Sequence, residues 1–367
     1  IMKIELIRKN ELEGYARRSL EEFSSDIPIT LPRASSQSRN PDAKSDDPLL
    51  IVAREGKKLL SFIGMYPSRV QGKPSEKIYW VSCWWKAKSV SSSVSRRVLE
   101  KFLEISGEKI GLPHLPPHII KTLSKYDIKV EGRKGLMIRF RSAIHERSLM
   151  RSIKGKYSPL IQFIRRSALL KTYDRIINIF KNNNIIPGKK VYDPGFEIID
   201  RFPPAEFFAF IDKNFKDFLT LPYKENIEWI LNNSWLVNPE KADPETQERY
   251  HFSYVTDDFH HFFPVLKEEG KITGTGFFSV RDGAVKSLFI FALSGSEEKF
   301  LKNITGYIQS QKSYHTLITY EPLYYSFLKE NMNTGIKHHE IKRYTGVGKA
   351  EYLQLKFTDG DGDSCFT

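Results

Sequence analysis

The chain has 367 residues, of which 40% are hydrophobic, 13% aromatic and 28% charged, and its formal net charge is +13. This composition can bury sizeable cores, which excludes a disordered or collagen-like protein, and the length suits two domains. No stretch of about 18 residues is free of charge, so no membrane-spanning helix is predicted. The opening residues lack the apolar segment of a signal peptide, and the two cysteines lie far apart, so we expect a cytoplasmic protein without a disulfide framework.

The first half of the chain alternates between strand and helix patterns. We expect strands over 2–8, 49–54, 59–66, 78–86, 109–112 and 135–141, and helices over 11–23, 94–105 and 117–125. The stretch 33–47 between the first helix and the second strand is polar and rich in turn-forming residues. It is predicted to be a loop, either ordered over a site or flexible.

The second half repeats this order of elements. A strand-rich region over 250–265 precedes strands over 272–280, 286–292, 314–320, 337–344 and 351–357, and helices over 297–311 and 322–331. Each half has a Glu-Gly-Lys turn, around Gly56 and Gly270, and a later helix that opens on Pro117 or Pro322. The repeat indicates an internal duplication, the alternative being coincidence among common α/β elements.

The positive charge is concentrated between the two halves. Residues 145–190 contain eleven Lys or Arg against two acids, which accounts for +9 of the +13. Apolar residues recur there at helical spacing, so 145–190 is predicted to be a basic amphipathic connector that can contact an anionic membrane. It separates a first domain, 2–144, from a second, 191–357, and the Gly- and Asp-rich tail 358–367 is predicted to be disordered.

Short motifs spread over the whole chain accompany this order of elements. They are Arg33-Ala34-Ser35-Ser36-Gln37, Asn40-Pro41, Asp46-Asp47, Ile63-Gly64 with Pro67, Trp80-Val81-Ser82-Cys83-Trp84-Trp85, Trp229-Ile230, Trp235 and Tyr250-His251-Phe252-Ser253. Together they resemble the GNAT acyltransferases, in the tandem form found in bacterial surface-polysaccharide gene clusters. The resemblance implies an α/β fold of two GNAT-like domains and an N-acyltransferase that uses acetyl-CoA or another acyl-CoA on an amine, with an amino-sugar as acceptor.

In the GNAT family a helix N-terminus holds the pyrophosphate of the cofactor, because its backbone N–H groups and dipole favour anions. The matching stretch here, 90–97, has serines in place of the family's glycines and lacks its leading arginine. The candidate cofactor residues are Ser91, Ser92, Ser93, Ser95 and Arg96, the alternative being an ordinary serine-capped helix. In the second half, Ser294 and Glu297 match a capping box, and two carboxylates in the first turn would repel a pyrophosphate, so the first half is expected to hold the cofactor.

Acyl transfer to an amine needs a base, and in the resembled family a tyrosine often supplies the acid. Thr122 and Phe327 stand at the place of that tyrosine, so this acid is missing. His114 and His118, at a strand end and a helix start, are the candidate bases, with Asp47 as a third. The alternatives are surface histidines in a proline-rich turn and a turn-forming aspartate.

The acceptor is expected to contact the polar loop and the tryptophan-rich strand. The candidates are Arg33, Gln37, Asn40, Ser82, Trp84 and Trp85. Alternation along a strand places Trp80, Ser82 and Trp84 on one face, and the alternative is that these aromatic rings belong to a core. No metal site is predicted, because the adjacent histidine pairs would point to opposite faces of a strand.

Two further functions stay open. The missing glycines and tyrosine favour a catalytically degenerate GNAT-fold binding protein that docks on an anionic membrane at the inner membrane surface. The basic connector also suits a Fem-like aminoacyl transferase that uses charged tRNA. Nothing in the sequence reads bases specifically, so nucleic acid is not the predicted partner.

Overall fold

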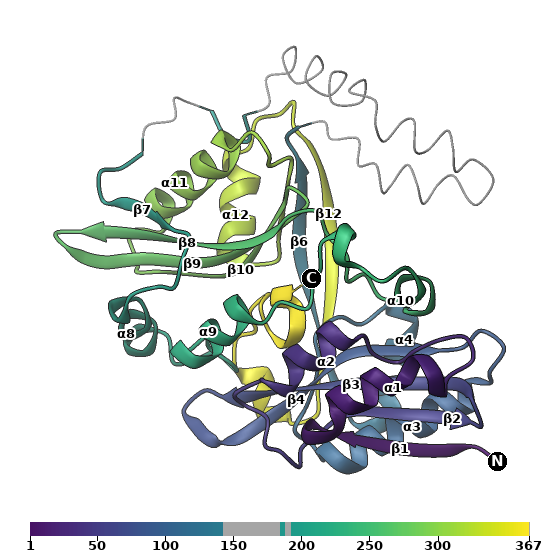
Figure 1. The fold of residues 1–367 in the computed structure, drawn as a ribbon. Helices are drawn as coiled ribbons and strands as arrows, with labels where there is room; N and C mark the ends of the chain where they lie inside the picture. The colour runs from purple at the N-terminus through teal and green to yellow at the C-terminus, as the bar shows by residue number, and fades with distance from the viewer. Residues whose placement is uncertain (142–183, 188–191, 367) are drawn as a thin grey trace.

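The computed structural model describes residues 1–141, 184–187 and 192–366. In these ranges twelve strands form one continuous sheet in the order β1-β2-β3-β4-β5-β12-β6-β11-β10-β9-β8-β7 (Figure 1). Helices α1 to α4 lie with the first-half strands, and α11 and α12 lie with the second-half strands and β6 (Figure 1). The predicted mixed α/β class is confirmed.

The first half follows the predicted order with one exception. Its elements are β1 (Lys3–Arg8), η1 (Lys9–Glu11), α1 (Leu12–Glu22), α2 (Leu31–Ser38), β2 (Pro48–Glu55), β3 (Lys58–Val70), β4 (Lys73–Lys86), α3 (Ser92–Ser106), β5 (Ile110–Leu112), α4 (Pro117–Leu123), η2 (Ser124–Tyr126) and β6 (Lys129–Arg139). The prediction of a loop over 33–47 was wrong for its first part, which forms α2. Thr30 caps this helix by accepting a hydrogen bond from the backbone N–H of Arg33, and both Arg33 and Gln37 are buried.

The second half has the same core order after an additional helical segment. Its elements are β7 (Phe196–Ile199), α8 (Ala205–Asn214), α9 (Lys224–Asn232), η3 (Pro239–Lys241), α10 (Pro244–Arg249), β8 (Phe259–Glu268), β9 (Lys271–Arg281), β10 (Ala284–Ala292), α11 (Glu297–Ser310), β11 (Thr316–Thr319), α12 (Pro322–Asn331), β12 (Lys337–Val347), η4 (Ala350–Gln354) and η5 (Gly362–Phe366). The strand predicted over 351–357 is wrong, because Tyr352 is fully buried and its hydroxyl donates to Glu76, which holds this segment in the turn η4. The series β8-β9-β10-α11-β11-α12 matches β2-β3-β4-α3-β5-α4, so the repeated order is confirmed.

The last strand of each half pairs with the other half. β6 lies between β11 and β12, with Thr316 opposite Arg139, and β12 lies beside β5, with Gly346 opposite Leu112. β6 and β12 also pair with each other along their whole length, from Lys337 opposite Arg139 onward. The predicted boundaries at 144 and 191 therefore divide the chain but not the sheet, because β6 and β12 join the two halves.

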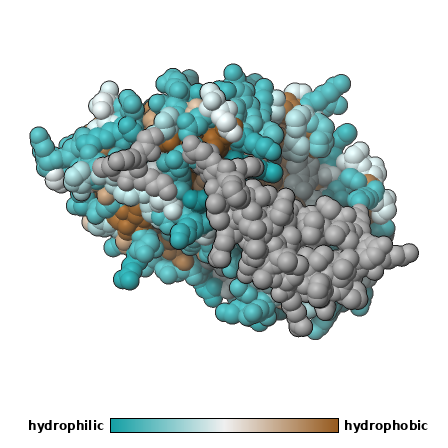
Figure 2. Space-filling view, turned by 90° about the horizontal axis from the view of Figure 1, so that it is seen from above, coloured by the Kyte–Doolittle hydropathy of each residue, from teal (hydrophilic) through white to brown (hydrophobic). Residues whose placement is uncertain are grey.

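The predicted connector, 145–190, lies outside the described residues except for 184–187, where Ile185 and Ile186 are buried with Phe140. None of the helices in the described ranges is long and apolar enough to cross a membrane. The face turned to the viewer in Figure 2 carries mostly hydrophilic side chains with a few hydrophobic areas among them.

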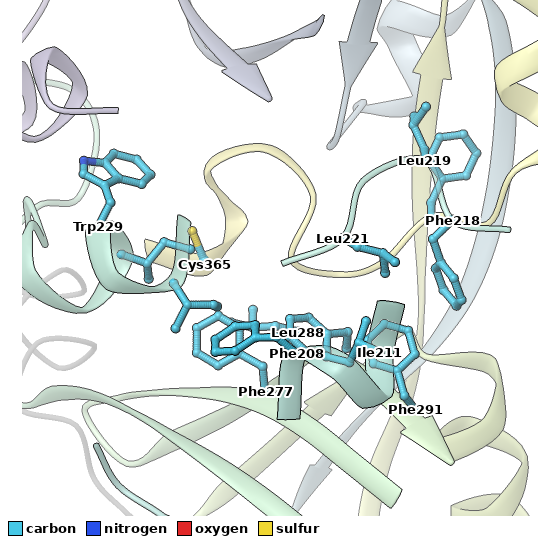
Figure 3. Packing of buried hydrophobic residues seen from close by; sticks show 14 of the residues in the cluster. Phe208, Ile211, Phe218, Leu219, Leu221, Trp229, Phe277, Leu288, Phe291 and Cys365 are labelled. Carbon is cyan, nitrogen blue, oxygen red and sulfur yellow. The ribbon is translucent and has the colours of Figure 1, made fainter. Parts of the chain in front are cut away.

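The predicted disorder of the tail 358–367 is wrong for residues 358–366. Asp359 and Phe366 are fully buried, and the backbone N–H of Gly360 donates to the carbonyl oxygen of Leu288 over 2.8 Å. Cys365 lies in an apolar cluster near Trp229 (Figure 3). The tail is ordered because buried cations from both halves bind its acidic side chains, so burial does not leave these charges unpaired.

Candidate functional site

Strands β4 and β5 run side by side only briefly and then separate. They pair in parallel at Tyr79 opposite Ile110 and at Trp80 opposite Gly111. β5 ends at Leu112, whereas β4 continues to Lys86, so within the described ranges β4 has no strand partner on that side beyond the pairing. Along this edge the carbonyl oxygen of Ser82 accepts from Arg33 Nη2 over 3.2 Å, and an edge without a neighbouring strand can offer backbone donors and acceptors to a ligand.

A cavity of about 790 Å³ lies at this opening, and we call it the β4 cavity. It contains seven of the predicted site residues, namely Arg33, Ser82, Trp84, Trp85, Ser95, His114 and His118. The second half contributes Trp235, Phe252, Ser253, Arg281, Lys286, Ile318, Tyr320 and Arg343, and the tail contributes Asp363 and Ser364. The predicted first-half site is therefore completed by residues from the second half and from the tail.

A β-bulge in β4 sets the direction of the side chains in the cavity wall. Gly64 pairs with Cys83 and Met65 with Val81, so Ser82 is the extra residue on β4. The bulge reverses the alternation beyond it. Trp84 consequently packs in the cluster that contains α3, whereas Trp80 packs in the cluster that contains the tail. The predicted common face for these two tryptophans was wrong because of this insertion.

Arg33 lies at the centre of a buried polar network in the cavity wall. Its Nη2 donates to Oδ2 of Asp363 over 2.6 Å and its Nη1 donates to the Tyr250 hydroxyl over 3.1 Å. Ser82 Oγ donates to the same carboxylate oxygen over 2.8 Å, and Gln37 Nε2 donates to Ser82 Oγ over 3.2 Å. Arg33 and Gln37, which were predicted to contact the acceptor substrate, therefore bind other parts of the chain. Arg33 and Ser82 also line the cavity.

Among the predicted site residues outside the cavity, Asp47 and Asn40 bind other parts of the first half. Asp47 forms an ion pair with Lys77 Nζ at 2.6 Å and accepts a hydrogen bond from the Tyr79 hydroxyl at 3.2 Å. Asn40 is buried and its Nδ2 donates to the carbonyl oxygen of Pro67 over 3.0 Å. Neither side chain lines the β4 cavity. These polar groups are satisfied within the loop and its neighbouring strands, so the structure does not bring them together with the predicted residues in the cavity.

His114 and His118 both line the cavity, His114 just after β5 and His118 in the first turn of α4. Loss of solvation lowers the pKa of His114, and the positive charges of Arg343 and Lys286 lower it further. A ring with a lowered pKa is neutral at pH 7 and can accept a proton. Between the two predicted bases, the surroundings thus favour His114.

The N-terminus of α3 stands at one end of the cavity. Ser91 Oγ accepts from the backbone N–H of Ser93 over 3.3 Å, and Ser95 lines the cavity and accepts from Trp84 Nε1 over 2.8 Å. The first turn carries no acid, and Ser91, Ser92, Ser93 and Arg96 are exposed. These four residues do not line the cavity themselves, but hydroxyl donors, a positive helix end and a cation suit a phosphate group at its entrance.

The equivalent helix in the second half has the opposite charge. α11 begins after Ser296 and carries Glu297 and Glu298 in its first turn, as the sequence predicted. The expected capping box does not form, because Ser296 is the N-cap and Glu297 instead accepts from the backbone N–H of Gly295 over 2.6 Å. The carboxylates still make this helix end unfavourable for an anion.

The opening between β10 and β11 is filled by the tail. These strands pair in parallel only from Ala284 opposite Thr316 to Lys286 opposite Ile318, so they separate as β4 and β5 do. Gly360 bonds to β10 beyond this point, and the backbone N–H of Asp359 donates to Oε1 of Glu321 over 3.0 Å. Burial raises the pKa of Glu321 to about 8. The second half therefore has the same strand geometry without the same free edge.

Sequence reasoning missed the contributions of Lys286, Arg343 and Asp363. Both Lys286 and Arg343 lie on strands of the second half, and Arg343 reaches the cavity because β12 pairs with β5. Asp363 belongs to a repeated Asp-Gly pattern, which was the one signal that could have marked the tail. Among residues 1–141, 184–187 and 192–366, no group of three or more His, Cys, Asp or Glu is placed to hold a metal ion.

No family model matches the chain, and no curated protein matches it. Among solved structures, a GCN5-related N-acetyltransferase from Anabaena variabilis is 9% identical, with a TM-score of 0.49, over 95% of this chain and 73% of that one. A GCN5-related N-acetyltransferase from Kribbella flavida is 11% identical, with a TM-score of 0.45, over 94% of this chain and 70% of that one. The function proposed for this chain accordingly rests on its own strands and side chains.

Proposed function

We propose that the chain is an acyl-CoA-dependent N-acyltransferase of the GNAT type with one working site, the β4 cavity. The observation that carries the proposal is the free edge of β4 beside β5, which opens into a cavity that reaches the first turn of α3. Enclosed space, a free strand edge and a positive helix end are what a long, phosphate-bearing thioester requires. The second half lacks two of these features, since its strand edge is filled and its helix end is acidic.

The cofactor residues follow from this arrangement. Ser91, Ser92, Ser93 and Arg96 would hold the pyrophosphate at the start of α3, and the edge of β4 would bind the pantetheine arm. The cofactor, acetyl-CoA or another acyl-CoA, supplies an activated acyl thioester when bound. Serines replace the glycines of the resembled family, and they suit the site because they are small and add hydroxyl donors.

His114 is the proposed base, which takes a proton from the attacking amine. The acceptor side of the cavity has aromatic walls from Trp84 and Trp85 and polar groups from Arg33 and Ser82. Aromatic rings with a few placed polar groups suit a sugar ring, so an amino-sugar is the proposed acceptor and surface-polysaccharide synthesis is the proposed role.

The test adds a negative charge at the start of α3. Ser92→Glu should repel a pyrophosphate, yet a carboxylate at a helix N-terminus stabilises the helix, so lost binding cannot be attributed to unfolding. Ser92→Gln is the neutral control, and Ser313→Glu adds the same charge at an exposed serine before β11. Isothermal calorimetry with acetyl-CoA, with free CoA in parallel, should give tight binding for both controls and at least about tenfold weaker binding for S92E.

The outcomes separate the candidate functions. Equal affinities for S92E and S92Q would remove α3 from the cofactor site. Binding of neither acetyl-CoA, a longer acyl-CoA nor CoA to the wild type would refute the acyltransferase and favour the non-catalytic binding protein. Where binding is found, release of free thiol in the presence of amino-sugars measures transfer directly.

A further inference from the structure

The β4 cavity carries an excess of positive charge. Its lining contains five cationic side chains, Arg33, Lys86, Arg281, Lys286 and Arg343, and one carboxylate, that of Asp363. A cavity with this balance favours an anionic ligand, because low-dielectric walls strengthen the attraction. An anionic ligand needs a cation whose hydrogen-bond donors are not all used within the protein.

Four of these five cations have partners within the protein. Arg33 is paired with Asp363 at 2.6 Å, and Arg343 is paired with Asp359 and also donates to the carbonyl oxygen of Pro113. Lys86 Nζ donates to the carbonyl oxygens of Ala87 and Val90 over 2.9 and 2.6 Å. Arg281 is likewise engaged, through a 2.6 Å bond to Ser253. These groups therefore contribute mainly a positive electrostatic potential to the cavity, rather than a hydrogen-bond donor for a ligand.

Lys286 differs from them. Within the described ranges its ammonium makes one hydrogen bond, over 3.3 Å to the carbonyl oxygen of Ser364, and no carboxylate lies at salt-bridge distance. An ammonium has three donors, so two remain for a ligand in the cavity that this side chain lines. Burial lowers the pKa of Lys286 to about 8, which leaves most of the ammonium charged at pH 7.

We propose that Lys286 binds a carboxylate or phosphate group of the acceptor, so that the substrate is an amine that also bears an anion. This inference rests on the proposed acyltransferase function and narrows its acceptor. Lys286 and His114 both line the β4 cavity. An anion held by Lys286 would bring the amine of the same molecule close to the proposed base.

The test compares matched ligands without any acyl-CoA. Binding of glucosamine 6-phosphate is measured against glucosamine, and binding of L-alanine against L-alaninamide, by calorimetry at pH 7. The first pair tests phosphate and the second tests carboxylate. The wild type should prefer the anionic member of at least one pair by about tenfold or more, because a charge-assisted hydrogen bond replaces a contact with water.

Lys286→Met removes the charge and keeps an unbranched apolar stem, so this variant should fold and lose the preference. Lys286→Arg should keep a preference for the anion. Lys342→Met is the control, because Lys342 lies on the exposed side of β12 next to Arg343 and its loss changes the net charge equally. Melting temperatures without ligand show whether each variant is folded.

Each result has one meaning. An equal affinity for the two members of both pairs in the wild type would overturn the proposal, and so would a K342M variant that loses the preference as fully as K286M. Preference for the anion together with failure to bind any acyl-CoA would refute the acyltransferase while the anion site stands. Acyl-CoA binding without any anion preference would leave the acyltransferase in place and overturn the role of Lys286.

Discussion

The buried pair of Arg33 and Asp363 should determine much of the stability of the chain. Arg33 is 5% exposed and Asp363 is 7% exposed, and Asp363 also accepts a hydrogen bond from Ser82. Asp363→Ala would leave the guanidinium charge buried without its carboxylate. Breaking a buried ion pair by removing one partner costs about 3–5 kcal/mol, so this variant should lose that much free energy of unfolding.

Urea unfolding at pH 7 measures the loss, and Asp212→Ala serves as the control. Asp212 is an exposed acid on α8, so its removal should change the free energy of unfolding by about 0.5 kcal/mol or less. A second arm combines D363A with Arg33→Met. Because the unpaired charge is then gone, R33M should cost less in the D363A background than in the wild type, and the difference measures the coupling.

Two results would refute this reasoning. The first is a D363A variant as stable as D212A, which would mean that the tail is not held in the core. The second is an R33M substitution with the same cost in both backgrounds, which would mean that the two side chains do not interact. A D363A variant as stable as the wild type would also support the disordered tail that the sequence predicts.

Three further predictions concern the sheet, the filled opening and the proposed base. Gly111→Ala should destabilise the fold by about 1–3 kcal/mol or more in urea unfolding, because a Cβ at this position would lie 2.2 Å from Cε3 of the buried Trp80. The control is Gly335→Ala, which should be nearly neutral because a Cβ there would have no atom within 4 Å. The pKa of Glu321 is raised from 4.5 to about 8, so this carboxyl group holds its proton more tightly in the folded state, and the free energy of unfolding of the wild type should fall as pH rises from about 4.5 to about 8. Glu321→Gln should flatten this fall. An unchanged slope for the variant, in unfolding measured at several pH values, would contradict the assignment. His114→Gln should lower kcat by about 100- to 10,000-fold with little change in the KM for acyl-CoA, and an unchanged kcat in steady-state kinetics would exclude His114 as the base.

Local patterns were sufficient to predict most elements, because hydrophobic periodicity and turn residues act within a few positions of each other. The Glu-Gly-Lys turn at Gly56 and its counterpart at Gly270 both have a positive φ and both join antiparallel strands, as predicted. The pairing of β6 and β12 with strands of the other half could not be predicted in this way. Strand order depends on contacts between residues about 200 positions apart, such as Gly346 with Val130, which no local pattern encodes.

The errors about polar segments have a common cause. The segment of α2 was predicted to be part of an ordered or flexible loop, and the tail to be disordered, because both stretches are polar and rich in turn-forming residues, which are usually exposed. In the structure the charges of Arg33, Asp359 and Asp363 are buried because each finds a partner from another part of the chain. The aromatic strand was predicted more accurately, but the bulge at Ser82 reverses its faces, and a single inserted residue leaves no mark in the composition.

In both halves a parallel strand pair opens after a short stretch of pairing. The two openings differ because the tail fills only the one in the second half. Each half has a parallel pair that opens after two or three residues, and an open pair leaves strand-edge groups to be satisfied. In the second half Gly360 satisfies one of them, and the same tail then delivers Asp363 to Arg33 in the wall of the first-half cavity. The segment that closes one opening therefore helps to build the other. These contacts explain how two halves with the same order of elements come to have one open and one filled strand pair.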